Sequence, residues 1–193
     1  MSDDWLIGHA RRLGEALGAL ESLTEPLEAA AEAIASSLRA GGTVLTAGNG
    51  GSAAEAHHLA GELVGRLTAD REREPLRAVA LTGDPSIVSA IANDYGFEQV
   101  FARQVAALAR PGDVLVLLST SGSSPNLVAA ARRAAAGGVT IVGLLGGTAR
   151  QLHGLCDHVI AVPSTSVATI QECHLVLVHA LVARVEDRLA GSG

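Results

Sequence analysis

Residues 43–52 read Thr-Val-Leu-Thr-Ala-Gly-Asn-Gly-Gly-Ser, a short apolar run that passes directly into a glycine-rich loop. A helical pattern follows over residues 53–67, so this stretch predicts a strand, a tight loop and a helix. The glycines allow backbone N–H groups to approach a ligand at the start of the helix, which favours a cradle for a sugar or a phosphate. Ser52 and Glu55 also have the spacing of a helix-capping box, which would form without any ligand. Both interpretations stay open at this point.

Short apolar strands alternate with helical segments along most of the chain. The pattern predicts five strands, over residues 43–47, 77–81, 113–118, 140–145 and 158–162. Helices are expected over residues 53–67, 85–92, 98–109, 125–136 and 167–189. Such alternation is typical of parallel strands with helices on both faces. We therefore predict an α/β fold, with a doubly wound parallel five-stranded sheet flanked by helices.

The chain begins with a helical pattern that precedes the first strand. Leu13, Leu17 and Leu20 form one apolar stripe, and a second stripe runs over residues 27–38, where Pro26 is expected to start the helix. No linker-like segment divides the sequence. We expect one domain over residues 1–193, with helices over residues 4–39 as an N-terminal extension.

Composition excludes several classes of protein. The chain of 193 residues is 48% hydrophobic but only 2% aromatic, so Ala, Val, Leu and Ile must build the core. It contains no lysine, which excludes a Schiff-base aldolase, a pyridoxal-phosphate enzyme and a Walker-type nucleotide site. A formal net charge of −6 and the lack of a basic stripe argue against direct nucleic-acid binding.

The same composition argues against membrane association. No uninterrupted apolar run approaches the roughly 18 residues that a membrane span needs, and the start of the chain is acidic where a signal peptide would be basic. We therefore expect a cytoplasmic protein. Cys156 and Cys173 lack C-x-x-C spacing and lie in apolar surroundings, so we interpret them as buried thiols without a catalytic role.

A hydroxyl-rich loop, residues 119–125, reads Ser-Thr-Ser-Gly-Ser-Ser-Pro and follows the third predicted strand. Pro125 suits the first position of the next helix. In a chain without lysine, hydroxyls, backbone N–H groups and a helix dipole are the obvious means to hold an anion. We predict phosphate binding here, with an ordinary serine-rich loop as the alternative. A nucleophilic serine is disfavoured because the G-x-S-x-G pattern is absent.

Two predicted helices carry candidate metal ligands. His58 and Glu62 are four residues apart and therefore share a helix face. On the last helix Gln171, His174 and His179 lie broadly on one side of an almost wholly apolar segment, where an unsatisfied His would be costly. Each of these residues alone is more often a core residue than a ligand. Together their imidazole, carboxylate and amide groups are compatible with zinc, among other metals.

At these residues the chain resembles the sugar isomerase (SIS) domain family and, within it, the sedoheptulose 7-phosphate isomerases. The resemblance extends over nearly the whole chain, and the combination of motifs is far more specific than any single one. The motifs that carry it are Gly48-Asn49-Gly50-Gly51-Ser52, His58-x-x-x-Glu62, Ala92-Asn93-Asp94, Ser119-Thr120-Ser121-Gly122, Ile170-Gln171-Glu172 and His179.

This resemblance implies an aldose–ketose isomerase that converts sedoheptulose 7-phosphate to D-glycero-D-manno-heptose 7-phosphate, acts as a homotetramer with shared active sites, and binds zinc. By position, the metal ligands would be His58, Glu62, Gln171 and His179. Glu62 and His179 would also be the catalytic acid–base pair. The residues implied to contact the substrate are Asn49, Gly50, Gly51, Ser52, Glu62, Asn93, Asp94, Ser119, Thr120, Ser121, Ser124 and Gln171.

The sequence departs from the family pattern before the Ile-Gln-Glu motif, where many relatives have a polar residue and this chain has Ala168 and Thr169. Ser123 is a milder change after the phosphate-loop glycine. Two other functions use the same fold: a non-catalytic SIS adaptor of the DnaA-binding type, and a phosphosugar sensor. Neither function needs a base and a metal site, so the presence of Glu62 and His179 favours the enzyme.

Overall fold

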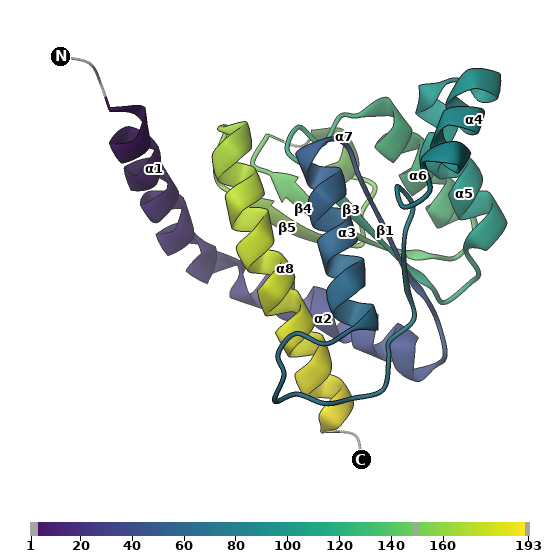
Figure 1. The fold of residues 1–193 in the computed structure, drawn as a ribbon, viewed down its shortest axis with the longest axis horizontal. Coiled ribbons are helices and arrows are strands. Elements are labelled where there is room, and N and C mark those ends of the chain that lie inside the picture. The colour runs from purple at the N-terminus through teal and green to yellow at the C-terminus, as the bar shows by residue number, and fades with distance from the viewer. Residues whose placement is uncertain (1–3, 149, 192–193) are drawn as a thin grey trace.

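The computed structural model describes residues 4–148 and 150–191, and a five-stranded sheet forms its centre. All strands are parallel and lie in the order β2-β1-β3-β4-β5. Their bounds are Val44–Gly48 for β1, Ala78–Ala80 for β2, Val114–Ser119 for β3, Thr140–Gly146 for β4 and His158–Val162 for β5. The predicted doubly wound α/β fold is confirmed (Figure 1).

Helices precede the sheet and connect its strands. The α-helices are α1 (Trp5–Ala19), α2 (Thr24–Arg39), α3 (Gly51–Val64), α4 (Pro85–Tyr95), α5 (Val100–Leu108), α6 (Pro125–Ala136), α7 (Arg150–His153) and α8 (Val167–Ala190). Two short 3₁₀ segments are η1 (Leu20–Leu23) and η2 (Phe97–Gln99).

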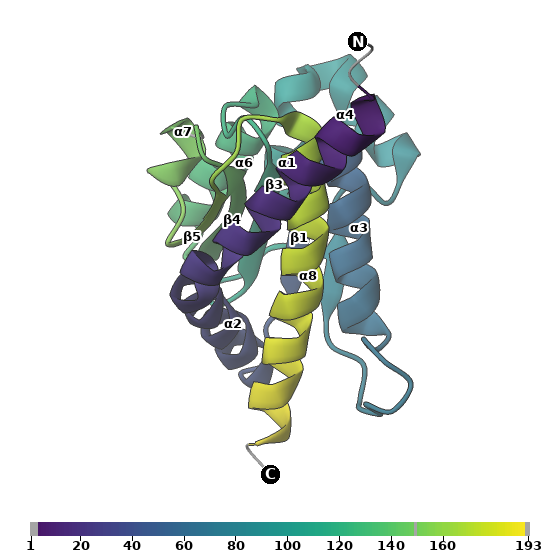
Figure 2. The same cartoon turned by 90° about the vertical axis from the view of Figure 1, so that its left-hand side faces the viewer.

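The sheet separates two apolar cores. Alternate residues of β3 enter them: Val114, Val116 and Leu118 pack with α2, α3 and α8, whereas Leu115 and Leu117 pack with α5 and α6. Because helices cover both faces, β3 is buried along its whole length, as is usual in parallel sheets. Figures 1 and 2 show the α2, α3 and α8 layer on one side and α4, α5 and α6 on the other.

The last helix, α8, is long and apolar enough to cross a membrane by length and composition alone. A core helix of a globular protein passes the same test. Residues along α8, including Cys173, Val178, Leu181 and Val182, are fully buried against the sheet and its neighbouring helices. This packing accounts for the apolar composition of α8.

The first helix, α1, extends away from the sheet and crosses α8 (Figures 1 and 2). The His9 Nε2 atom lies 2.9 Å from each carboxylate oxygen of Glu172 on α8, and Trp5 stacks on the His9 ring with centroids 4.7 Å apart. Trp5, Leu6 and Ile7 nevertheless stay about two-thirds exposed. Clustered exposed apolar side chains of this kind are typical of a protein–protein contact.

Most predicted boundaries agree with the structure to within a few residues, and the helix at 125–136 and the strand at 158–162 match it fully. Pro26 does not start the second helix. That helix begins at Thr24, and Pro26 is its third residue, where a backbone N–H has no partner within the helix in any case. The segment predicted as one helix over residues 98–109 begins with η2 and continues as α5.

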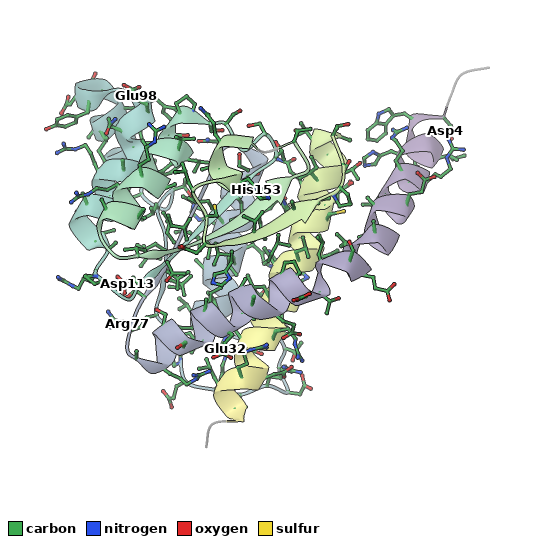
Figure 3. All side chains as sticks on the ribbon, turned by 180° about the vertical axis from the view of Figure 1, so that it is seen from behind. Asp4, Glu32, Arg77, Glu98, Asp113 and His153 are labelled. Carbon is green, nitrogen blue, oxygen red and sulfur yellow. The ribbon has the colours of Figure 1, made fainter. Side chains whose placement is uncertain are left out.

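Two aspartates secure the edge of the sheet where the strands begin, the buried Asp113, labelled in Figure 3, and the exposed Asp157. Asp113 accepts hydrogen bonds from the Thr43 and Arg110 N–H groups, both at 2.8 Å. Asp157 accepts one from the Ile141 N–H, also at 2.8 Å. These short side chains fix the turns that precede the strands, so the polar groups at this edge have a structural role.

The opposite edge contains the point where the strand order reverses. The chain passes from β1 to β2 on one side, and β3 then starts on the other side of β1. Ligands in open α/β sheets bind outside the carboxyl ends of the strands at such a reversal. The loops 48–52 and 119–125 follow β1 and β3, so both predicted phosphate loops lie there.

Glycine is required where β1 passes into α3. A Cβ atom on Gly48 would lie 2.3 Å from the Ser52 carbonyl oxygen, and Gly50 has a φ of +56°. The first position demands a close backbone approach and the second a left-handed conformation, which glycine adopts without a steric penalty. The loop geometry therefore depends on the glycines themselves.

We expect Gly48→Ala to lower the free energy of unfolding by about 1–3 kcal/mol, because the first turn of α3 must move to admit the methyl group. Gly61→Ala in the same helix is the matched control, since a Cβ there meets no atom within 4 Å among the described residues. The control should raise stability by about 0.5–1 kcal/mol. Urea unfolding of both variants measures this, and equal stabilities would contradict the steric argument.

Candidate active site

A cavity of about 300 Å³ opens at the reversal point between β1 and β3. It brings together most of the residues predicted to contact a substrate. The side chains and backbone that line it come from the two loops, the end of β3, α6 and the start of α8: Asn49, Gly50, Gly51, Ser52, Leu118, Ser119, Thr120, Ser121, Ser124, Leu127, Val167 and Gln171.

Three helices begin at this cavity. Gly51 starts α3, Ser124 is the N-cap of α6, and Val167 starts α8. The first N–H groups of a helix lack partners within it, and the aligned peptide dipoles give that end a partial positive charge. The lining contains no arginine, so the backbone supplies the positive potential. An anion such as a phosphate suits this environment.

Hydroxyl groups shape the loop after β3. Ser119 Oγ accepts a hydrogen bond from the Gly122 N–H at 3.0 Å and is almost fully buried. Ser121 Oγ accepts a longer one from the Ser123 N–H at 3.4 Å. Ser124 occupies the N-cap position of α6 without a side-chain capping bond to the described residues. Ser119 therefore supports the loop, and the Ser124 hydroxyl stays available to a ligand.

Paired amides join the two loops. Asn49 and Asn126 exchange hydrogen bonds of 2.9 and 2.8 Å through their side chains, and Asn126 Oδ1 also accepts from the Leu127 N–H. Asn126 is buried, and the sequence interpretation did not identify it. The only sequence signal for Asn126 was its polar side chain in the first turn of the predicted helix. Its partner Asn49 is 77 residues away, so the local pattern could not indicate the pair.

The Ser52–Glu55 capping box does not form. Helix α3 starts at Gly51 with Gly50 as its N-cap, and the described residues provide no side-chain capping bond there. Glu55 instead points to α8, where one of its carboxylate oxygens lies 3.6 Å from Nδ1 of the fully buried His174. The capping box was the alternative to a ligand cradle for the loop of residues 48–52. Because the box is not formed, that alternative no longer explains the loop.

His58, Glu62 and His179 come together between α3 and α8. The two His Nε2 atoms are 2.9 Å apart, and His58 Nε2 is 3.3 Å from a Glu62 carboxylate oxygen. All three ligand atoms lie within 4.8 Å of one another. Metal–ligand bonds of about 2.0–2.2 Å place the ligands of one ion at comparable separations. The geometry of the cluster is therefore compatible with a metal ion.

Other predicted site residues lie apart from this cluster. Gln171 lines the cavity and packs against Gly51, two helical turns before His179, a rise of about 12 Å along α8. Asn93 and Asp94 are exposed at the end of α4, where the Asn93 amide donates to the Asp94 carboxylate at 2.8 Å. Neither of these two residues lines the cavity in the single chain.

Both cysteines have the properties of unreactive thiols. Burial, assisted by the negative charge of Asp157, raises the pKa of Cys156 to about 12. Burial also raises the pKa of Cys173. The thiolate, which is the nucleophilic form, is therefore scarce near neutral pH. Cys156 and Cys173 are also unpaired.

Comparison with known proteins places the chain in a family. The SIS domain family model matches residues 10–146. A phosphoheptose isomerase from Burkholderia pseudomallei (strain 1710b) is 49% identical over 96% of this chain and 93% of its own length. The structure of a phosphoheptose isomerase from Neisseria gonorrhoeae superposes with a TM-score of 0.90 at 38% identity, covering 97% of this chain and 100% of that one.

A phosphoheptose isomerase structure from Francisella tularensis agrees equally well, with a TM-score of 0.91 at 36% identity over 97% of this chain and 99% of that one. These likenesses extend well beyond the residues of the SIS domain match and include both helices that carry the His–Glu cluster. The chain belongs to the SIS domain family and, within it, to the phosphoheptose isomerases.

Proposed function

We propose that the protein is an aldose–ketose isomerase that converts sedoheptulose 7-phosphate to D-glycero-D-manno-heptose 7-phosphate through an enediolate. One observation carries this proposal: the chain, a member of the phosphoheptose isomerases, has both a cavity at three helix N-termini and a cluster of His58, Glu62 and His179. The first feature suits the phosphate of the sugar. The second suits proton transfer at its other end.

The phosphate site is proposed at the first turns of α3 and α6. Backbone N–H groups there, together with the Thr120 and Ser124 hydroxyls that line the cavity, would donate to the phosphate oxygens. Ser119, Ser121, Ser52 and the glycines of the first loop would shape this cradle. Asn49, Gln171, Asn93 and Asp94 remain proposed contacts for the sugar.

Isomerisation requires a base that takes a proton from the carbon beside the carbonyl group and an acid that returns it to the neighbouring carbon. We assign these roles to Glu62 and His179. The Glu62 side chain is about three-quarters buried, and its carboxylate is held 3.3 Å from His58. A carboxylate and an imidazole placed in this way are common partners in general acid–base catalysis.

The donor set of His58, Glu62 and His179 fits zinc, because two imidazoles and a carboxylate are typical of catalytic zinc sites. The family resemblance adds Gln171 as the fourth proposed ligand, although in the single chain it packs against Gly51, apart from the other three. A bound zinc ion would supply positive charge that stabilises the developing negative charge on the enediolate oxygens. The chain itself would position these ligands through the packing of α3 on α8.

We further propose that the chain acts as one SIS domain, extended by the helices of residues 4–39, in a cytoplasmic homotetramer with shared active sites. Two features support the assembly: the exposed apolar side chains of α1, and the exposed Leu175 and Val176 on α8. A partner chain could also join the partly exposed His–Glu cluster to the cavity. No role for nucleic acid or a membrane is proposed.

The adaptor and sensor functions are less well supported. Either would use the fold and the hydroxyl loop, but neither needs a base beside two imidazoles. In this chain His58, Glu62 and His179 converge from positions as far apart as 121 residues. An arrangement of this kind is more readily explained by chemistry than by adaptor binding.

For the phosphate site, we expect Thr120→Ala and Ser124→Ala each to raise KM about tenfold or more, since a hydrogen bond to a charged group is worth about 1.5–3 kcal/mol. Ser123→Ala is the control, because Ser123 lies in the same loop but outside the cavity lining. Steady-state kinetics with sedoheptulose 7-phosphate provide the measurement. An unchanged KM in both variants would contradict the proposed phosphate site.

For the acid–base pair, Glu62→Gln and His179→Gln should lower turnover by about 10²–10⁴-fold while sugar-phosphate binding survives. Glutamine keeps the approximate shape and one donor or acceptor at each position. Turnover, calorimetric binding and solvent-deuterium incorporation beside the carbonyl group are measured together. Near wild-type exchange by Glu62→Gln would assign proton abstraction to another group.

For the metal, the purified protein should contain about one zinc per active site, and removal by a chelator should abolish turnover until zinc is restored. His58→Ala should lower the zinc content, because it removes an imidazole from the cluster. Metal analysis alongside the isomerase assay provides the measurement. Full activity in zinc-free protein would refute the metal requirement.

A further inference from the structure

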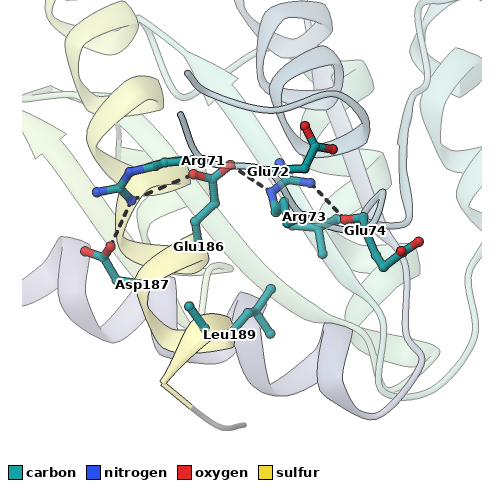
Figure 4. Close-up of a pocket in the computed structure, with 9 residues that line it drawn as sticks. Arg71, Glu72, Arg73, Glu74, Glu186, Asp187 and Leu189 are labelled. Carbon is teal, nitrogen blue, oxygen red and sulfur yellow. Dashed lines mark hydrogen bonds and ion pairs between the residues drawn. The ribbon is translucent and has the colours of Figure 1, made fainter. Parts of the chain in front are cut away.

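The charged segment of residues 71–75 contains an arginine that is bound on several sides. Arg73 Nε donates to a Glu186 carboxylate oxygen at 2.8 Å, and its Nη2 and Nη1 atoms donate to the Glu62 and Leu63 carbonyl oxygens at 2.7 and 2.9 Å. Nη1 also reaches the Glu74 carbonyl oxygen at 3.2 Å. Figure 4 shows Arg73 between Glu186 and Glu74. The planar guanidinium group thus joins three segments of the chain.

Two of these bonds cap the end of α3. That helix ends at Val64, so the carbonyl groups of its last turn have no partner within the helix. A guanidinium group there satisfies two of them and places positive charge at the negative end of the helix dipole. The capped turn includes Glu62, the proposed base and metal ligand. Arg73 therefore fixes the backbone from which that carboxylate extends.

The third bond connects this turn to α8. Glu186 is only 5% exposed, and the same oxygen that binds Arg73 accepts the Leu67 N–H at 3.3 Å. Glu186 lies seven residues after His179, which is two turns along the same face of α8. The Arg73–Glu186 pair thus ties the Glu62 end of α3 to the helix that carries His179.

Packing alone does not hold this junction. A cavity of about 500 Å³ lies between residues 71–76 and the last turns of α8, with Arg73 and Glu186 among its lining (Figure 4). The neighbouring Arg71 is more exposed and makes its short contact with Asp187, at 2.8 Å, where both side chains are about two-fifths exposed. It reaches Glu186 only at 3.8 Å, through the carboxylate oxygen that does not bind Arg73 (Figure 4). Exposed pairs contribute little, whereas removing one partner of a buried pair is costly.

We propose that Arg73 and Glu186 are positioning residues of the active site, which set the distance between the Glu62 carboxylate and the His179 imidazole. This inference rests on the roles proposed above for Glu62 and His179. Neither Arg73 nor Glu186 touches the substrate. They act by holding the ends of two helices whose side chains must meet at one ion and at two adjacent substrate carbons.

The test compares Arg73→Gln and Arg73→Lys with Arg71→Gln, which removes an arginine from the same segment. Cobalt(II) is titrated into metal-free protein and followed by its visible absorption, kcat and KM are measured with sedoheptulose 7-phosphate, and thermal unfolding is recorded. We expect Arg73→Gln to weaken cobalt binding and lower kcat by about 10–100-fold each, the usual effect of losing an outer-shell support. KM should change much less, and Arg73→Lys should recover part of both losses.

Glu186→Gln gives a second, milder test, because it keeps an oxygen for Arg73 while removing the buried charge. Its effects should fall between those of Arg73→Lys and Arg73→Gln. A folded Arg73→Gln protein that matches Arg71→Gln in cobalt affinity and kcat overturns the inference, as does a variant that loses only thermal stability. If the wild type binds cobalt in an Arg73-dependent manner but does not isomerise the sugar, the positioning inference stands and the proposed function fails.

Discussion

The candidate site depends on the electrostatic field of backbone amides at one edge of the sheet. The strand order β2-β1-β3-β4-β5 brings the first turns of α3, α6 and α8 to the same cavity. Partial positive charge at the helix starts follows from that geometry, and the residues that line the cavity include no arginine. A chain with no lysine therefore keeps a site suited to phosphate, and the glycine at position 48 matters because it lets α3 start close to β1.

The pairing of α3 with α8 is the second organising element. Each helix buries one side in the same core, and each contributes part of the cluster of His58, Glu62 and His179. The position of these three side chains is therefore a property of how two helices pack. Arg73 and Glu186 secure the far end of that pair, while Gln171 packs against Gly51 at the near end. The site is thus held at both ends by contacts between residues distant in sequence.

Sequence patterns predicted the features that neighbouring residues determine, namely the strands, the helix starts and the faces of helices. Apolar runs located the strands, and Pro125 marked the start of α6, since proline favours the first helical turn. The spacing of His58 and Glu62 predicted that they share one face of α3, because residues four apart are neighbours on a helix. Local patterns did not predict the long-range contacts. Asn126 binds Asn49, and Glu55 lies beside His174 and does not cap its helix. Arg73 binds Glu186, which is 113 residues away. Each depends on which elements meet in three dimensions.

A binding site made of main-chain groups has a particular robustness to mutation. Side-chain substitutions around the cavity would change which sugar fits, yet the amides at the helix starts would persist as long as the strand order does. The His–Glu cluster has no such protection, because it is made of three side chains and one substitution breaks it. Gene duplication could thus release a copy from catalysis while it still recognises phosphorylated sugars, and the fold offers a short evolutionary path from metabolism to sensing.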